Sequence, residues 1–433
     1  ASVALSDAEM PCRQCWGASF GIFNLPQAAA RGESTASNLR NEAARLHRGA
    51  CSFTPHLCSQ PEQGYSRAIQ KQIAGARTPV APHLVRLPGR VKLGFKDAAS
   101  ASPVGVWSPI DNDSSVVAAN ASASPSWILP PSDSWQRPCM GVTLQPIIAC
   151  FSFFAGNFGH SLHDLLPLAA WLRYSFPDHT LVMPASPAFS AALSYINGNH
   201  TSKQIVLLEE GITLCAASAT VVAVPAKRKG LLNFAWVRKA SFMSALRSWL
   251  MSTGAIDRIG NGTVIVYSRH GTRTVSHGRT MTHRHVEEIV TTTKNAMLQF
   301  GISGSLVRYD GAVNARPMPV ADQAKLFRHA DAVIGPHGAG LANILWLPTR
   351  TSMHVRLHGC DRPQVLEFVC GERSANVQNG CPYQRSHWGM LSTAPWVQWH
   401  HQFLTEKSSS SVTWIDLHEL QTALKSMWSY RVS

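Results

Sequence analysis

Apolar positions along the chain change their spacing at about residue 141. From there, short apolar runs alternate with stretches in which apolar residues recur every three to four positions, a pattern typical of βαβ units around a mainly parallel sheet. Helices are predicted over 161–175 and 240–253. The strands predicted in the same part of the chain are 180–183, 204–208 and 220–224.

The alternation begins again after Gly260, which predicts a second nucleotide-fold-like half. Its predicted strands are 264–268, 306–309, 332–335 and 364–369. Its predicted helices are 284–299, closed by Gly301, then about 320–330, and 338–346. We therefore predict an α/β fold with two Rossmann-like domains facing a cleft, in which ligands bind beyond the carboxyl ends of the strands.

The segment before residue 141 has a different character. Residues 1–140 show little periodicity and contain Ser/Ala/Pro-rich pieces such as 100–110. We interpret them as a loosely structured, cysteine-containing N-terminal extension, with the alternative that part of it joins the first domain. The predicted domains are then 141–255 and 256–405, followed by a C-terminal helix within 406–433.

Charge narrows the class of partner. The chain has 39 Lys and Arg residues against 25 Asp and Glu residues, a net charge of +14, which favours nucleotides, other polyanions or acidic surfaces. A basic, solvated surface is the alternative interpretation. Nucleic acid is not predicted, because the densest basic cluster is the short run 227–229. No apolar run reaches the ~18 residues of a membrane span, so a membrane link is expected only through an anchor preceding residue 1.

Cysteines and glycosylation triplets bear on the compartment. The ten cysteines permit five disulfides without dictating their pairing. Cys12 and Cys15 form a lone CxxC, which we interpret as a disulfide element rather than a metal or redox site. Four N-x-Ser/Thr triplets begin at Asn112, Asn120, Asn199 and Asn261. Together these features favour the secretory pathway.

The segment 332–348 carries the most chemical information. An apolar strand breaks at Gly335 and Pro336 and enters a helix through His337, Gly338, Ala339 and Gly340. A glycine-lined turn at a helix N-terminus offers backbone N–H groups and a positive dipole end to a phosphate. A tight structural turn with a capping histidine is the alternative.

Three further groups are candidates for the site. Arg269 and Arg273 follow a predicted strand end, where guanidinium groups suit phosphate oxygens, although two solvated arginines would show the same pattern. His160 and Asp164 stand at i and i+4, so they share a helix face and could act as a general base; a structural pair is the alternative. Glu367 near the end of a strand could receive ribose hydroxyls or pair with a nearby arginine.

Two other patterns carry less weight. The histidines at 277, 283 and 285, with Glu287 and Glu288, lack metal-ligand spacing and are interpreted as a polar helix face. The run from Gly159 begins like the nucleophile turn of an α/β-hydrolase, but His163 stands where the closing glycine belongs.

Taken in order, three segments resemble glycosyltransferase family 61: GNFGHSLHDLLP (156–167), YSRHGTR (267–273) and DQAKLFRHADAVIGPHGAGLANILWLP (322–348). That family includes plant-type β-1,2-xylosyltransferases of N-glycan maturation, xylan-decorating transferases of grasses and animal O-GlcNAc transferases. The resemblance covers about residues 150–430. The chain departs from the family pattern after Pro348, where sixteen residues, TRTSMHVRLHGCDRPQ, precede the strand acid, and at 282–285, where the usual Asn-Glu pair is missing.

The resemblance implies an inverting, GT-B-like enzyme that moves a sugar from a UDP-sugar onto a glycan or glycoprotein hydroxyl in the Golgi lumen or the endoplasmic reticulum. The second domain would bind the UDP-sugar: His337 to Gly340 would hold the diphosphate, Arg269 and Arg273 would neutralise it, and Glu367 would contact the ribose. Asp164 and His160 would face the acceptor, one of them as catalytic base. UDP-xylose with an N-glycan acceptor is the first expectation, followed by GlcNAc or arabinose transfer.

No metal is expected to be essential. No Asp-x-Asp pair lies at a predicted strand end, because Asp111 and Asp113 fall in the extension, and the basic residues can supply the positive charge that a metal would provide. A function of another class remains open: a non-catalytic, secreted carbohydrate- or polyanion-binding protein, favoured by the basic charge and the 13 Trp residues.

Overall fold

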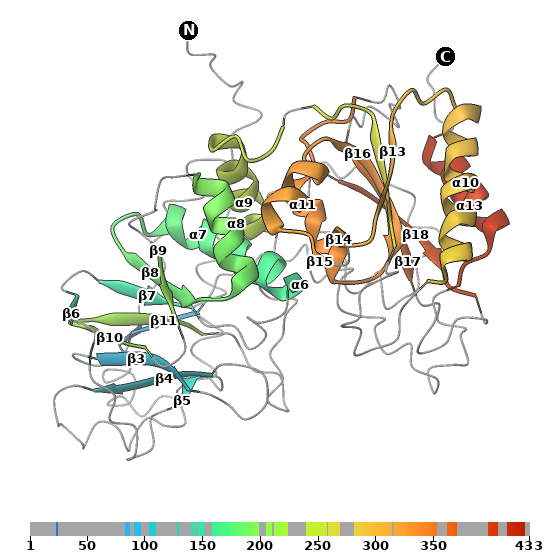
Figure 1. Ribbon diagram of the computed structural model, residues 1–433. Helices are drawn as coiled ribbons and strands as arrows, with labels where there is room; N and C mark the ends of the chain where they lie inside the picture. Colours follow the sequence, from blue (N-terminus) through green and yellow to red (C-terminus); the bar gives the residue numbers. More distant parts are fainter. Residues whose placement is uncertain are drawn as a thin grey trace, which may run out of the picture. The chain divides into compact units, whose positions relative to one another are not determined.

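The structure is a computed structural model (Figure 1). It describes residues 23–24, 83–86, 91–96, 104–109, 128–129, 139, 142–143, 146–150, 158–198, 205–209, 212–223, 240–257, 259–268, 281–313, 316–352, 362–369, 397–405 and 414–428. The described residues fall into two compact units. Unit 1 holds those up to Leu246 except Ala191–Gly198, and unit 2 holds Ala191–Gly198 and those from Arg247 onward.

Unit 2 is built on a five-stranded parallel sheet. Its spatial order is β13 (Leu306–Tyr309), β12 (Thr263–Tyr267), β16 (Ala330–Pro336), β17 (Gln364–Val369) and β18 (Gln398–Phe403). All residues of β12 and β16 are buried, as expected for parallel strands covered on both faces. The chain passes from β12 to β13 on one side and later to β16 on the other, so a topological switch point lies between β12 and β16. Doubly wound sheets bind ligands at the carboxyl side of such a point.

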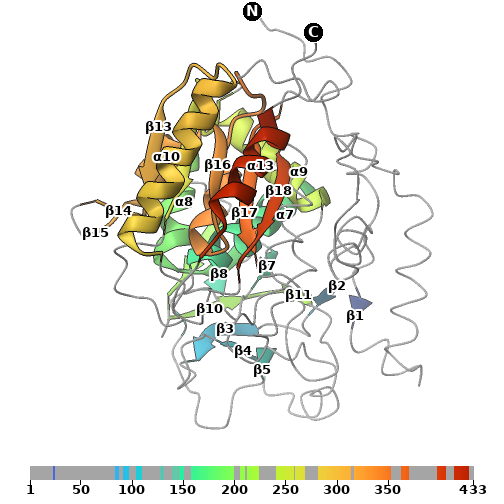
Figure 2. The ribbon, with the colours of Figure 1, turned by 90° about the vertical axis from the view of Figure 1, so that its right-hand side faces the viewer.

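Helices cover both faces of this sheet. The helices α10 (His283–Gln299) and α13 (Leu417–Trp428) pack together on one face, where Ile289 and Leu420 share a core with Phe368 of β17. Figures 1 and 2 show these two helices side by side. On the other face, α11 (Val320–Phe327) packs against the 3₁₀ helix η4 (Ala339–Trp346).

The sequence explains the ends of α10. The side chain of Thr282 accepts a hydrogen bond from the backbone N–H of His285 and so caps the first turn. At the other end, Gly301 adopts a φ of +63°, the left-handed conformation that terminates many helices. The predicted closure of this helix by Gly301 is therefore confirmed.

Unit 1 contains a six-stranded sheet with a parallel centre. Its order is β1 (Phe23–Asn24), β2 (His83–Arg86), β11 (Ala219–Ala223), β7 (Ile147–Ala149), β8 (Thr180–Pro184) and β9 (Ile205–Leu208). A helical segment formed by α6 (Phe158–His160), the π-helix η2 (Ser161–Leu165) and α7 (Leu166–Ser175) connects β7 to β8. The helix α8 (Pro187–Asn197) follows β8 and passes into unit 2 at Ala191. The helix α9 (Ala240–Ser252) contains a second boundary, between Leu246 and Arg247.

A second sheet of unit 1 draws on the region before residue 141. Its order is β5 (Ile128–Leu129), β4 (Val104–Pro109), β3 (Val91–Lys96), β10 (Thr213–Ala216) and β6 (Val142–Thr143). The piece 100–110, interpreted as loosely structured, thus contains β4, which pairs antiparallel with β3 along its whole length. The strand β4 has no clear periodicity of its own, and its extended conformation is explained by pairing with β3. The predicted domain boundaries at 140, 255 and 405 stay predictions.

The predicted α/β class with parallel strands is confirmed. The strands 306–309 and 364–369 have the predicted bounds, and most other elements agree within two residues. Two helices differ: the one predicted to reach residue 330 ends at Phe327, and the one predicted over 338–346 is a 3₁₀ helix that starts at Ala339. None of the described helices is long and apolar enough to cross a membrane.

A buried carboxylate joins the segments at the start of the central strands. Asp331, in β16, is fully buried and accepts hydrogen bonds from the backbone N–H groups of Gly262 and Ser352 and from the Ser352 hydroxyl. A side chain at Gly260 would overlap this carboxylate. Asp331 therefore fixes the loop before β12 to the amino-terminal end of β16.

Replacement Asp331→Ala is expected to lower the free energy of unfolding of unit 2 by about 2–4 kcal/mol, because it leaves two backbone N–H groups without an acceptor. Urea denaturation followed by tryptophan fluorescence measures the change. Asp322→Ala, at an exposed position of α11, is the matched control. Equal midpoints for the two variants would contradict this role of Asp331.

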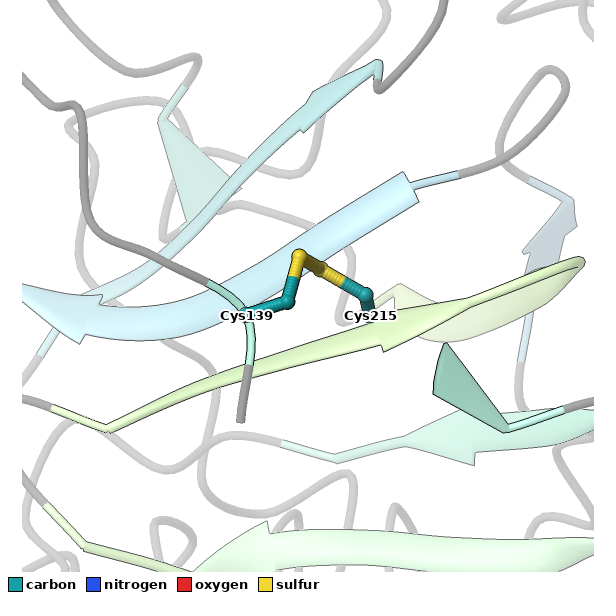
Figure 3. The surroundings of a disulfide bond; sticks show 2 residues. All are labelled: Cys139 and Cys215. Carbon is teal, nitrogen blue, oxygen red and sulfur yellow. A yellow bond between two sulfur atoms is a disulfide. The ribbon is translucent and has the colours of Figure 1, made fainter. Parts of the chain in front are cut away.

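Unit 1 carries a disulfide between Cys139 and Cys215 (Figure 3). Cys215 lies in β10, so the bond ties the segment before β6 to the second sheet, across 76 positions of sequence. Among the described residues Cys150 is a free thiol; it is buried, and burial raises its pKa. The CxxC at Cys12 and Cys15 lies outside the described residues.

Loss of this disulfide is expected to lower the stability of unit 1 by about 2–4 kcal/mol, because the bond restricts the unfolded chain over a long loop. The two single variants, Cys139→Ala and Cys215→Ala, should each cost about as much as the double variant, since either one removes the whole bond. Thermal denaturation under non-reducing conditions measures all three. Additive losses would show that the two sulfurs are not joined.

Candidate active site

The glycine-rich turn stands at the carboxyl end of β16, beside the switch point of unit 2. The backbone N–H of His337 donates to the carbonyl of Phe368 at 3.0 Å, which holds the turn against β17. Gly338 is the N-cap residue of η4, and Ala339 and Gly340 form its first turn. The first N–H groups of a helix have no acceptor within it, so this turn can present donors to an anion.

Tyr267, the last residue of β12, explains two of the glycines. A Cβ at Gly340 would lie 2.5 Å from the Tyr267 ring, and one at Gly335 would lie 2.6 Å from its carbonyl oxygen. Neither position can hold a side chain. Because Gly335 and Gly340 have none, the end of β12 can approach the turn. Gly338 has a φ of 165°, an extended conformation that any residue adopts.

A buried carboxylate holds the histidine of the turn. Glu367 of β17 has no exposed surface. One of its oxygens lies 2.6 Å from Nδ1 of His337, and the other accepts a hydrogen bond of 3.1 Å from the indole N–H of Trp399 in β18. The negative charge favours a proton on Nδ1 of His337, so that the ring orientation and tautomer are set by Glu367.

The ribose contact predicted for Glu367 stays a prediction, and the geometry shows a further role for this residue. Both carboxylate oxygens already have partners within the protein, and no surface of the residue is open to a ligand. We therefore assign Glu367 as a positioning residue for His337. His337 itself is 8% exposed and is the member of the pair with a surface that a ligand can reach.

A second buried network fixes the body of η4. The side-chain amide of Asn343 donates to Oε1 of Gln323 in α11 at 2.7 Å and to the carbonyl of Gly340 at 3.0 Å. The hydroxyl of Tyr309 donates to the same oxygen of Gln323, and burial raises the pKa of Tyr309. The bond from Asn343 back to Gly340 joins residues three apart, which fits the tighter 3₁₀ spacing observed here.

A buried arginine caps the far end of η4. Nη1 of Arg247, in α9, donates to the carbonyl of Leu347 at 2.7 Å, and Leu347 is the C-cap residue of η4. Burial lowers the pKa of Arg247 to about 9, so the side chain is a cation at neutral pH. A cation is favourable at this end of a helix, where the last carbonyl groups lack partners within the helix. An anion is favoured at the opposite end.

In unit 1, His160 and Asp164 are in contact. Nδ1 of His160 lies 2.6 Å from Oδ2 of Asp164. The side chain of Asp164 is 4% exposed and that of His160 is 20% exposed, so the imidazole is the group that a ligand can reach. With the proton on Nδ1, the carboxylate orients the ring and Nε2 is its basic nitrogen.

The backbone around this pair is unusual. Residues Ser161–Leu165 form a π-helical turn between two α-helical pieces, a feature often found at functional sites. The turn also brings in His163, whose Nδ1 lies 3.5 Å from Oδ1 of Asp164. Ser161 bonds to the hydroxyl of Ser186 at 3.0 Å, and Ser186 in turn accepts from the N–H of Phe189 at the start of α8.

The remaining predicted site residues divide into two groups. Arg269 and Arg273 lie outside the described residues, so their contacts stay predictions. The polar helix face predicted for the histidine cluster is wrong for His285, which is fully buried, stacks on Trp414 and accepts a hydrogen bond from the N–H of Ile415. His283 is exposed as predicted, and position 277 lies outside the described residues.

Comparison with known proteins agrees with the resemblance seen in the sequence. Residues 158–354 match the model of the family described as Glycosyltransferase 61. This part of the chain is a glycosyltransferase 61 domain. It begins at α6 and includes His160, Asp164 and the whole glycine-rich turn, whereas Glu367 lies beyond it.

The other comparisons add little. Among curated proteins, none matches the chain. One matching solved structure is a flavoprotein from Thermotoga maritima, 11% identical, which aligns over 77% of this chain and 88% of its own. Its TM-score is 0.24, and it carries no argument about this glycosyltransferase.

Four residues of the site were not found by sequence reasoning. His163 carried a usable signal, because it stands three positions after His160 and so on the same helix face. Tyr267, Arg247 and Trp399 carried none, since each acts through a contact with a distant segment. Trp399 is 32 positions from Glu367, and only the pairing of β17 with β18 brings them together.

Replacement Glu367→Gln is expected to lower the free energy of unfolding of unit 2 by about 1–3 kcal/mol, because both partners donate hydrogen bonds and a glutamine offers only one acceptor oxygen. Adding Trp399→Phe should recover part of this loss, since it removes the N–H that faces the glutamine NH₂. Urea denaturation of the single and double variants measures this coupling.

The matched control is Glu419→Gln on the exposed side of α13, for which no change is expected. A double variant less stable than the sum of the two single changes would contradict the arrangement of two donors around one carboxylate.

Proposed function

We propose that this glycosyltransferase is an inverting enzyme that moves a sugar from a UDP-sugar to a hydroxyl of a glycan or glycoprotein. The observation that carries the proposal is the glycine-rich turn with His337 held by the buried Glu367, at the carboxyl side of the switch point. Donors concentrated at a helix start in this position suit a diphosphate.

The donor diphosphate would lie against the start of η4. The N–H groups of Ala339 and Gly340, with the N-cap residue Gly338, would face its oxygens. A His337 ring protonated on both nitrogens would also donate a hydrogen bond from Nε2 to them. Arg269 follows the end of β12 by two positions, and it would supply further positive charge together with Arg273. These groups would stabilise the negative charge that develops on the departing UDP.

His160 would act as the general base, and Asp164 would orient it. Nε2 of His160 takes the proton from the acceptor hydroxyl as its oxygen attacks the anomeric carbon. The bond from that carbon to the diphosphate oxygen breaks, and UDP leaves with the electron pair. One displacement of this kind inverts the configuration at the anomeric carbon. The lower exposure of Asp164 favours His160 over Asp164 as the group that meets the acceptor.

The finer assignments belong to the same proposal. The first expected donor is UDP-xylose with an N-glycan acceptor, followed by UDP-GlcNAc and UDP-arabinose. No metal is expected to be essential, because the basic groups and the helix start supply the positive charge. We also propose a GT-B arrangement and residence in the lumen of the Golgi or the endoplasmic reticulum, for which the Cys139–Cys215 disulfide is suitable.

The test is an incubation of EDTA-treated protein with UDP-xylose, UDP-GlcNAc and UDP-arabinose in turn, over N-glycan and xylan-oligosaccharide acceptors, with products read by mass spectrometry. Product is expected with one donor. His160→Asn is expected to lower kcat about 10²–10⁴-fold, because asparagine can keep a donor near Asp164 but has no equivalent of Nε2. Arg269→Ala should raise KM for the donor.

His179→Asn is the matched control, since His179 lies in unit 1 on the turn before β8 and contacts Phe176 rather than the site. Full activity of His160→Asn would exclude His160 as the base. Activity that disappears in EDTA and returns with Mn²⁺ would exclude the metal-free mechanism. Retention on glycan or heparin columns without turnover of any donor would favour the non-catalytic binding protein.

A further inference from the structure

Three side chains on one helical turn of unit 1 have the chemistry of metal ligands. His160, His163 and Asp164 each offer one ligand atom, and these atoms all lie within 4.8 Å of one another. The positions are i, i+3 and i+4, and the π-helical turn that follows His160 carries the other two. The base proposed above uses two of them and leaves His163 without a role.

The two histidines contact different oxygens of Asp164, at distances near the ligand spacing of a small tetrahedral ion. Zn²⁺ binds imidazole nitrogen and carboxylate oxygen at about 2.0–2.2 Å, so two of its ligand atoms stand about 3.3–3.5 Å apart. Nδ1 of His163 and Oδ1 of Asp164 are already 3.5 Å apart. Nδ1 of His160 and Oδ2 of Asp164 are 2.6 Å apart, the distance of a hydrogen bond. An ion that replaces the proton of this bond requires the two atoms to move apart by about 0.7 Å.

Burial and donor type restrict the ion. Two imidazoles and one carboxylate suit Zn²⁺, Co²⁺ and Ni²⁺, whereas Mg²⁺ and Ca²⁺ prefer oxygen ligands throughout. His163 is fully buried and Asp164 nearly so, which makes a neutralising cation favourable beside the carboxylate. His160 is the most exposed of the three side chains, so an ion would enter from its side, and a water there would complete the coordination.

We propose that His160, His163 and Asp164 form a binding site for a single Zn²⁺-class transition-metal ion, and that the ion inhibits sugar transfer. An imidazole that binds a metal through Nδ1 keeps its proton on Nε2. His160 in this state cannot accept the proton of an acceptor hydroxyl. The inhibition rests on the proposed function, whereas the binding site rests on the geometry of unit 1.

The binding test uses the full chain without a purification tag, treated with EDTA and freed from it. Co²⁺ serves as the probe, because tetrahedral coordination gives intense visible absorption, and Zn²⁺ is then added in competition. Wild-type protein is expected to bind one Co²⁺ per chain with this spectrum. His163→Gln is expected to weaken binding at least about 100-fold, because it removes a direct ligand.

His179→Gln is the matched control: it removes a histidine from the same unit outside the cluster, and binding should be unchanged. Circular dichroism establishes that each variant is folded. If His163→Gln does not fold, His160→Gln replaces it, since His160 is partly exposed and is also a ligand. Equal binding by the wild type and a folded ligand variant, or no tetrahedral spectrum with wild type, would overturn the site.

The inhibition test compares initial rates of transfer at increasing Zn²⁺. Wild type and His179→Gln should be inhibited at the concentration at which they bind Zn²⁺, and His163→Gln only at about 100-fold higher concentration. Equal inhibition of His163→Gln and wild type would overturn the inhibitory role. A protein that binds Co²⁺ as described but transfers no sugar would retain the metal site and refute the proposed function, so the two failures are distinguishable.

Discussion

The buried carboxylate of Glu367 is the interaction on which the arrangement of unit 2 depends. An ionised carboxylate without exposed surface costs several kcal/mol unless partners surround it. His337 and Trp399 provide those partners, and they come from the turn after β16 and from β18. Glu367 therefore links β17 to the turn after β16 and to β18, and the histidine of the turn is held with a defined orientation.

Packing and further hydrogen bonds fix the rest of the turn and the helix η4 that follows it. The absence of side chains at Gly335 and Gly340 lets Tyr267 close against them, which places the end of β12 beside the turn. The hydrogen bond from Asn343 to Gln323 holds η4 to α11, and Arg247 caps the far end of η4. The donors at the start of η4 are thus positioned before any ligand arrives, and such preorganisation is what makes electrostatic stabilisation of a leaving group effective.

Much of the fold could be predicted from the sequence because its signals are local. Parallel strands buried on both faces appear as short apolar runs, and α10 carries both of its end signals, Thr282 and Gly301. The strand β4 could not be predicted in this way, since it is explained by pairing with β3. The 3₁₀ form of η4 was missed for a similar reason: the Asn343 bond that accompanies it also holds Gln323 of α11.

The candidate site shows the same division. The spacing of His160 and Asp164 predicted their contact, whereas the anion site predicted at the glycine-rich turn stays a prediction. The ribose contact of Glu367 stays a prediction, and the partners of its two oxygens were not foreseen, because a sequence shows an acid in a strand but not whether its oxygens face solvent or two donors. One of those donors is Trp399, which lies 32 positions from Glu367 and which no local sequence pattern connects to the turn.

Hydrogen–deuterium exchange of the full chain with and without saturating UDP tests the central claim most directly. If the turn held by Glu367 is the diphosphate site, UDP should slow exchange in peptides that cover His337–Trp346 and leave β3 and β4 unchanged. Binding of UDP measured by calorimetry, with no slowing in those peptides, would contradict the account and place the nucleotide elsewhere.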